Sequence, residues 1–167
     1  MANVVANVLV GTGVLYYHTT PGTASAAVVT EFGYTEDGVT IEYNADIADI
    51  EVEEETFAIN RVITKEEGSI TCNLAENLLA NLENAMAGAL TGGAGIIDLG
   101  AGAIRDMALR FYGVAPGGLH RTIYVPYAHP VGPVGMSYKK GEKTIIPVQF
   151  KAYQGVAGGT PIKITDA

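Results

Sequence analysis

The sequence predicts a mainly β fold: two packed antiparallel sheets in a sandwich or barrel, with one flanking helix and long loops or arms. Several segments alternate apolar and polar residues with a period of two, which is the pattern of half-buried strands. Only one segment has helical periodicity. The chain also contains 21 glycines and no tryptophan, which favours contacts made by sheets and by close backbone packing.

Four strands are predicted before the helix. The alternation is clean from Gly38, where Val39, Ile41 and Tyr43 point to one side of a strand. In the last of the four, Ile70 and Leu74 should face the core. The four segments are residues 39–44, 50–53, 57–63 and 69–74.

The helix is expected over about residues 74–88. Asn73 is a suitable N-cap, and Glu76 three residues later would complete a capping box. Gly88 is a plausible stop. The apolar stripe Leu74, Leu78, Leu82, Ala85 and Met86 should face the core, while Asn77, Asn81 and Asn84 should face away.

Three more strands are predicted after the helix, at about residues 107–112, 122–127 and 144–153. Between the helix and these strands, residues 88–103 lack phosphate-binding spacing and indicate a flexible loop. Because Pro126 cannot donate to a sheet ladder, its strand should lie at an edge or bend early. The predicted organisation is therefore an extended N-terminal arm with short strands over residues 1–37, a sandwich domain over 38–153 and a mobile tail over 154–167.

Charge is divided unevenly along the chain, whose formal net charge is -8. Residues 31–67 contain twelve acids against Arg61 and Lys65, a local charge of -10. Residues 101–163 contain eight bases against Asp106 and Glu142, a local charge of +6. Two such segments favour head-to-tail association between copies of the chain, although solvated charged faces are the simpler explanation.

No residue pattern indicates catalysis, a cofactor or a metal. The three histidines, His18, His120 and His129, have no paired spacing. Cys72 is the only cysteine, so it cannot form an internal disulfide and is expected to be a buried hydrophobe. No apolar run approaches the ~18 residues of a membrane helix, and no signal peptide is expected.

Two blocks of the sequence resemble the tail tube (major tail) proteins of long-tailed bacteriophages. The first is residues 33–81, with the opening strand DGVTI, the acidic DIADIEVEEE and the strand-to-helix passage VITKEEGSITCNLAENLLANL. The second is GEKTIIPVQFKAY, residues 141–153. The resemblance implies two antiparallel sheets with a flanking helix, a fold shared with contractile-tail and type VI secretion tubes. It also implies rings, typically hexameric, that stack into a hollow tube.

A tube subunit would be a virion tail protein assembled in the host cytoplasm, with tape measure and terminator proteins as partners and no membrane partner. Double-stranded DNA would pass through the lumen without specific binding, which acidic residues favour because like charges repel. Expected lumen or rim residues are Glu42, Asp46, Asp49, Glu51 and Glu53. Expected subunit-interface residues are Arg105, Arg110, Lys139, Lys140 and Lys143. A secretion-system tube and a carbohydrate- or protein-binding sandwich module remain alternatives.

Overall fold

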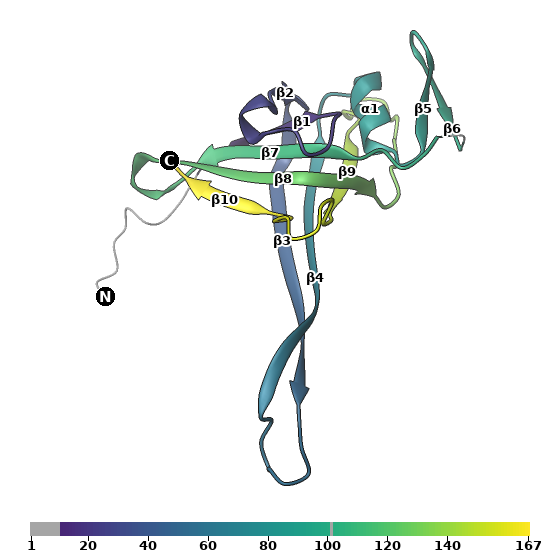
Figure 1. The fold of residues 1–167 in the computed structure, drawn as a ribbon. Helices are drawn as coiled ribbons and strands as arrows, with labels where there is room; N and C mark the ends of the chain where they lie inside the picture. The colour runs from purple at the N-terminus through teal and green to yellow at the C-terminus, as the bar shows by residue number, and fades with distance from the viewer. Residues whose placement is uncertain (1–10, 101) are drawn as a thin grey trace.

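The computed structural model describes residues 11–100 and 102–167, and it is built on one large antiparallel sheet (Figure 1). This eight-stranded sheet has the order β2-β1-β7-β8-β9-β4-β3, and β10 pairs with β8. A second sheet contains only β5 and β6. The predicted fold class is confirmed: the protein is mainly β, antiparallel and consistent with a sandwich, with one α-helix, α1.

The elements follow one another along the described chain with two short 3-10 turns, η2 and η3, among them. Their bounds are β1 Gly13–His18, η2 Ser25–Ala27, β2 Thr30–Glu31, β3 Thr35–Ile50, β4 Asn60–Leu74, α1 Leu79–Ala85, β5 Ala89–Gly93, β6 Ile96–Leu99, β7 Met107–Val114, η3 Pro116–Gly118, β8 His120–Val131, β9 Ile146–Ala152 and β10 Lys163–Asp166.

The core lies against one face of the large sheet. As the alternation predicts, the inward side chains of β4 and β9 are buried, and β7 adds Met107 and Leu109. The inward residues of β4 and β9 are Ile70, Cys72, Leu74, Ile146, Val148 and Phe150.

Part of the predicted arm belongs to the body of the fold. Residues 1–10 lie outside the described residues, but β1 pairs with β7 over its whole length. Leu15, Val28 and Phe32 are fully buried. Phe32 is held between the rings of Tyr17, at 4.3 Å, and Phe150, at 5.6 Å. These contacts join residues that are far apart in the sequence, so no local pattern could indicate them.

The predicted strands of residues 39–63 were too short. Residues 39–44 and 50–53 were expected as separate strands, but β3 runs from Thr35 to Ile50 and 51–59 form a turn. The expected strands at 57–63 and 69–74 are largely one strand, β4. The two strands pair from Thr35–Leu74 to Ile50–Asn60 as one long hairpin.

The helix prediction was wrong in its length and its cap, and its orientation was right for Leu82, Ala85 and Asn77 only. α1 covers only residues 79–85, its N-cap is Leu78 without a side-chain bond, and Asn73 belongs to β4. Asn81 and Asn84 are buried, whereas Leu78 is 56% exposed. The reason is a tertiary hydrogen bond: the Asn81 amide donates to the backbone carbonyls of Phe32, at 2.9 Å, and Glu76, at 3.1 Å.

Replacing Asn81 with leucine should destabilise the protein, although leucine has the higher helix propensity. The substitution leaves the buried carbonyl of Phe32 without its donor, which costs about 1–3 kcal/mol. Urea denaturation measures the change in the free energy of unfolding. The control is Asn77→Leu, an exposed position whose amide donates to the exposed Tyr138 hydroxyl; equal losses at both positions would contradict the inward role of Asn81.

Two further segments differ from their predictions. The glycine-rich segment forms the β5–β6 ribbon with a turn at Ala94 and Gly95, where Gly95 has a φ of 76°. The strand with Pro126, β8, is not at an edge, because β7 flanks it on one side and β9 with β10 on the other. Pro126 is tolerated there because it lies at a register shift, between the β10-paired and β9-paired parts of the strand.

The C-terminal segment also contributes to the sheet. We expected residues 154–167 to be mobile, but β10 pairs with β8 and Asp166 forms an ion pair with Arg121 at 2.7 Å. Pairing between β8 and the end of the chain gives this segment a fixed position.

Candidate assembly surface

The β3–β4 hairpin projects from the body as a free two-stranded ribbon (Figure 1). β9 pairs with β4 only over residues 69–74, so the distal part of β4 has β3 as its only neighbour among the described strands. At about 3.3 Å per residue, the sixteen residues of β3 span roughly 50 Å. An isolated ribbon of this kind is marginally stable in water.

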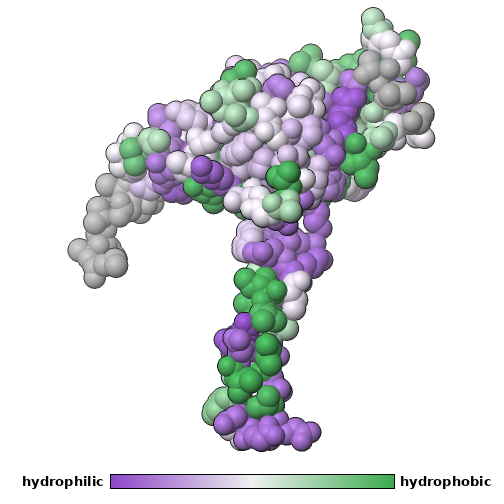
Figure 2. Space-filling model, viewed as in Figure 1, coloured by the Kyte–Doolittle hydropathy of each residue, from purple (hydrophilic) through white to green (hydrophobic). Residues whose placement is uncertain are grey.

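Large apolar side chains cover this ribbon and are exposed to solvent. Phe57 is 85% exposed, Ile47 62% and Ile63 58%. Figure 2 shows them as a green band on the distal hairpin. An exposed apolar patch of this kind is typical of an interaction site. The exposed apolar residues of the hairpin are Tyr43, Ile47, Ile50, Val52, Phe57, Ile59, Val62 and Ile63.

Both faces of the ribbon are apolar. Ile47 lies opposite Ile63 on one face, and Val62 lies opposite Ala48 on the other. The sequence ADIADI, residues 45–50, produces this arrangement because a three-residue spacing sends Ile47 and Ile50 to opposite faces. Such a break in two-residue alternation is the signal that could have distinguished this segment from a half-buried strand.

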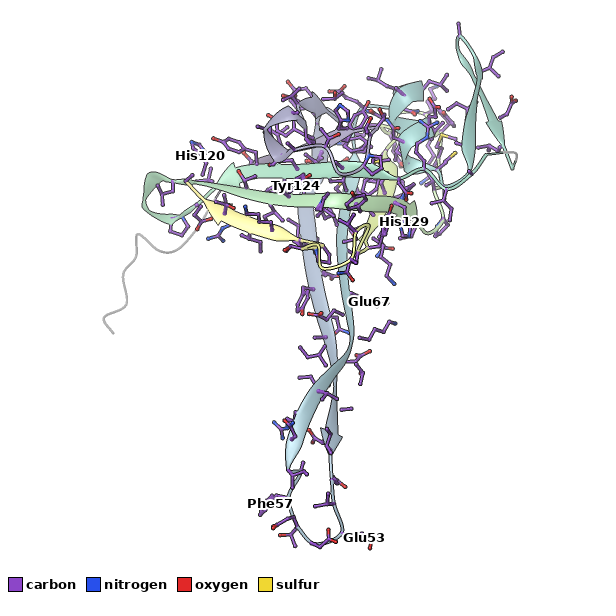
Figure 3. The ribbon with its side chains drawn as sticks, viewed as in Figure 1. Glu53, Phe57, Glu67, His120, Tyr124 and His129 are labelled. Atoms are coloured by element: carbon purple, nitrogen blue, oxygen red, sulfur yellow. The ribbon has the colours of Figure 1, made fainter. Side chains whose placement is uncertain are left out.

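The end of the ribbon is acidic. Four glutamates, Glu51, Glu53, Glu54 and Glu55, lie in the turn between the strands and are exposed. Within the described chain, none of them forms an ion pair, whereas Asp49 just above them pairs with Arg61 at 2.8 Å. Figure 3 shows Glu53 and Phe57 together at this tip. We call residues 51–59 the acidic tip.

The five predicted lumen or rim residues all belong to this hairpin, but they do not form one patch. Glu42 and Asp46 lie on one face of β3, and Asp49 lies on the opposite face. Glu51 and Glu53 lie in the acidic tip.

The two faces differ at the root of the hairpin. On one face, a groove of about 400 Å³ is lined mainly by polar side chains, including Glu42, Asn44, Gln149 and Lys151. On the other, a groove of about 620 Å³ is mainly apolar and is lined by Ile41, Tyr43, Gly68, Ala152, Ile162 and Ile164 among others. Gly68 lies close against Ile162: a Cβ at position 68 would come within 2.2 Å of the Ile162 Cδ1, so that side chain would have to shift.

A cluster of charges holds the root together. Glu67, labelled in Figure 3, accepts hydrogen bonds from Lys151 Nζ at 2.7 Å and Lys65 Nζ at 2.8 Å. These bonds, that of Lys151 most strongly, lower the pKa of Glu67 to about 2. On the opposite face, the Tyr43 hydroxyl donates to Glu66, which raises the pKa of Tyr43.

Glu67 should make the stability depend on pH in acid. Its pKa is lowered in the folded state, so its contribution is present above the unfolded value near 4.5 and is lost as the pH falls toward 2. In Glu67→Gln, the free energy of unfolding should therefore fall less between pH 5 and pH 2.5 than in the wild type. Urea denaturation across this range is the measurement. Glu53→Gln, which removes an unpaired carboxylate, is the control and should retain the wild-type slope.

Two of the five predicted interface bases are engaged inside the fold. Arg105 forms an ion pair with Glu83 at 2.6 Å. Arg110 lies over the Tyr16 ring, with its guanidinium carbon 4.7 Å from the centroid, and donates to the Ser25 carbonyl at 3.1 Å. Both side chains are therefore committed to their own subunit in this structure.

The other three predicted interface bases, Lys139, Lys140 and Lys143, are exposed on the loop before β9. Lys143 pairs with Glu36 at 2.8 Å and Lys139 pairs with Glu142 at 3.2 Å. Two ion pairs join the acidic and the basic segment within one subunit, Glu36–Lys143 and Glu67–Lys151. They compensate part of the uneven charge, whereas the four glutamates of the acidic tip form no ion pair within the described chain.

The remaining candidates do not converge on a site. His120 stacks on Tyr112 at 4.9 Å, and Figure 3 shows it far along β8 from His129. Residues 11–100 and 102–167 contain no group of three or more His, Cys, Asp or Glu side chains placed to bind a metal ion. Cys72 is buried, which raises the pKa of its thiol to about 12. In the same ranges, no helix has the length and apolar character needed to cross a bilayer.

The chain was also compared with known proteins. No model of a known protein family matches it, and the curated proteins contain no significant relative. The functional argument therefore depends on the fold and on the surface of the hairpin.

Proposed function

We propose that this protein is a structural subunit that assembles into stacked rings, forming the tube of a phage tail through which the genome is delivered. The observation that carries the proposal is the β3–β4 hairpin, whose distal half exposes apolar side chains on both faces. The resemblance of residues 33–81 and 141–153 to tail tube proteins supports the same function.

Assembly would supply the burial that the hairpin lacks. Covering one large apolar side chain contributes about 1.5–3 kcal/mol. Ile47, Phe57 and Ile63 are each more than half exposed. Contacts with neighbouring copies would therefore stabilise both the assembly and the ribbon, at the cost of the freedom lost on association.

The charges of β3 favour a head-to-tail arrangement. β3 is an open edge of the large sheet. If two copies paired β3 with β3 about a two-fold axis, the acids of one edge, among them Glu42 and Asp46, would approach those of the other, and like charges opposite one another are destabilising. Head-to-tail contacts avoid this pairing and close into rings or continue as tubes.

The root of the hairpin, on the face that carries Glu42 and Asp46, suits the lumen. Asn44 shares this part of the face, and the polar groove continues it onto β9. Lys65 and Lys151 also lie here, but Glu42, Asp46 and Glu67 outnumber them, so this surface would repel the phosphates of DNA and let the duplex slide. Tape measure and terminator proteins are the expected partners inside the tube and at its end.

Purified protein at increasing concentration tests the proposal. Sedimentation velocity should show concentration-dependent assembly, and negative-stain electron microscopy should show rings or tubes. Monomers throughout the range would contradict it. Monomers that bind a carbohydrate or an unrelated protein through the hairpin would favour the binding-module alternative.

A further inference from the structure

We infer that a β-bulge at Thr64 sets the direction of the distal hairpin, residues 47–63, and that Thr64 is thereby a positioning residue for assembly. The distal hairpin carries the acidic tip and most of the exposed apolar side chains of the β3–β4 ribbon. The inference rests on the proposed self-assembly. It adds what aims this surface at a neighbouring copy of the chain.

The bulge is a single extra residue in β4. Asp46 pairs with Lys65, and the next residue of β3, Ile47, pairs with Ile63. Thr64 therefore has no partner residue on β3, and its hydroxyl donates to the Asp46 carbonyl at 3.1 Å. An extra residue of this kind bends its strand and increases the local right-handed twist. Figure 1 shows the two paired strands crossing between the root of the ribbon and its tip.

The bulge also decides which side chains face one another in the distal hairpin. With the extra residue, Ile63 lies opposite Ile47. Asp49 lies opposite Arg61 and forms an ion pair with it at 2.8 Å. In a ladder that kept Thr64 in register, Ile47 would lie opposite Thr64 instead. Asp49 and Arg61 would then lie on opposite faces of the ribbon, so both facing pairs depend on the bulge.

The character of the ribbon changes at the bulge. In Figure 2 the ribbon is mostly purple next to the body and mostly green further out. Each of the three pairs on the body side of the bulge contains a charged residue, and these pairs are Asn44–Glu67, Ala45–Glu66 and Asp46–Lys65. The two pairs directly beyond the bulge are apolar, and they are Ile47–Ile63 and Ala48–Val62. The bulge thus lies between the charged root and the surface proposed to contact neighbouring copies.

No other strand of the described chain constrains the direction of the distal hairpin. β9 pairs with β4 only as far as Ser69, and β3 has β4 as its only neighbour among the described strands. None of the buried core residues of the described chain belongs to residues 47–63. Burial inside the subunit therefore does not require the bulge. Bulges commonly re-aim the side chains beyond them, and that is the role we assign to this one.

Deleting Thr64 tests the inference, because the deletion removes the bulge and keeps the pairing. Lys65 and Ile63 become consecutive, and their pairs with Asp46 and Ile47 then belong to one regular ladder. The facing pairs and the apolar side chains are retained, while the bend and the extra twist are lost. Thr64→Ser keeps both the extra residue and its hydroxyl, and it is the matched control.

The direction of the hairpin is measured on the single subunit. Pulsed electron paramagnetic resonance gives two distances from a spin label at Phe57→Cys, one to Gln149→Cys on β9 and one to Thr165→Cys on β10. All three positions are exposed, and Cys72 is buried and stays unlabelled. The four pairs beyond the bulge span roughly 13 Å, and Phe57 lies further out in the turn. In the deletion variant, at least one distance should therefore change by at least about 5 Å, whereas Thr64→Ser should keep both.

Assembly is the second measurement. The deletion should raise the concentration needed for assembly in sedimentation velocity by at least about tenfold, because the apolar side chains no longer fit the neighbouring copy. A second variant carries a threonine inserted between Asp46 and Ile47, which gives Thr64 a partner and removes the bulge by the opposite route. It should lose assembly to a similar extent. Thr64→Ser should assemble as the wild type does, and circular dichroism confirms that each variant is folded.

The outcomes separate the two proposals. A wild-type protein that does not assemble would overturn the proposed function, and with it any role of Thr64 in assembly, while the two distances would still show whether the bulge sets the direction. If the wild type assembles, but removal of the bulge changes neither distance by about 5 Å or leaves assembly at the wild-type concentration, the role of Thr64 is overturned and the proposed function stands.

Discussion

Replacing residues 46–65 with an Asn-Gly turn should give a folded protein that no longer assembles. The deletion joins Ala45 and Glu66, which lie directly opposite each other, by a two-residue hairpin turn. It removes the acidic tip and the exposed Ile47 and Ile63, but none of the buried core. Sedimentation velocity should therefore show monomers at concentrations where the wild type forms rings or tubes, while the far-ultraviolet circular dichroism keeps a β spectrum.

The matched variant keeps the hairpin at full length. Ile47→Ser with Ile63→Ser removes one facing apolar pair while leaving the glutamates of the tip in place. Like the shortened protein, this variant should assemble less readily than the wild type. Its free energy of unfolding should be nearly unchanged, because both side chains are exposed. A shortened protein that still forms tubes, or one that fails to fold, would show that the hairpin is not a dedicated assembly element.

Phe32→Ala should cost about 3–5 kcal/mol of stability, the range for truncating a buried phenylalanine. Phe32 is 1% exposed, and its ring lies between those of Tyr17 and Phe150. Because small domains are stable by only about 5–15 kcal/mol, a loss of this size is a large part of the total. Urea denaturation measures it.

The control for Phe32→Ala lies two residues further along the chain. Tyr34→Ala removes an aromatic ring that is 79% exposed and should change the free energy of unfolding by less than about 0.5 kcal/mol. Comparable losses at the two positions would mean that the segment before β3 binds loosely, as an arm does, rather than as part of the core.

Strands buried on one face could be predicted from the sequence, because the alternation of apolar and polar residues shows which side faces the core and which faces solvent. In β4 and β9, the inward residues alternate with mostly polar neighbours, and Ile70, Val148 and Phe150 are buried as expected. The period of two needs no knowledge of distant residues. The fold class follows from several such segments and a single helix.

Features that depend on distant partners could not be predicted in this way. Asn81 faces inward because the Phe32 carbonyl, 49 residues away, needs its amide. β1 pairs with β7, although about 90 residues separate the two strands in the sequence. Both are tertiary contacts that override local helical or loop preferences.

The exposed apolar residues of the hairpin could not be predicted either, because their exposure depends on where a neighbouring strand ends. Ile47, Phe57 and Ile63 are apolar, as core residues are; the sequence predicts a strand for Phe57 and Ile63, and it leaves Ile47 between two predicted strands. Their exposure follows from the end of β9 at Ala152, beyond which no described strand but β3 accompanies β4. The assignment of the nearby acids to a lumen or rim stays a prediction, and of the predicted interface bases Arg105 and Arg110 have partners inside the subunit.

The contact between Gly68 and Ile162 places the C-terminal segment against the root of the hairpin. The ribbon leaves the body where Gly68 lies under the Ile162 side chain, with no space between them for even a methyl group. A residue with a side chain at position 68 must therefore displace the Ile162 side chain near the far end of the chain. Because the ribbon is roughly 50 Å long, any small rotation of its root would become a displacement of many ångströms at Phe57.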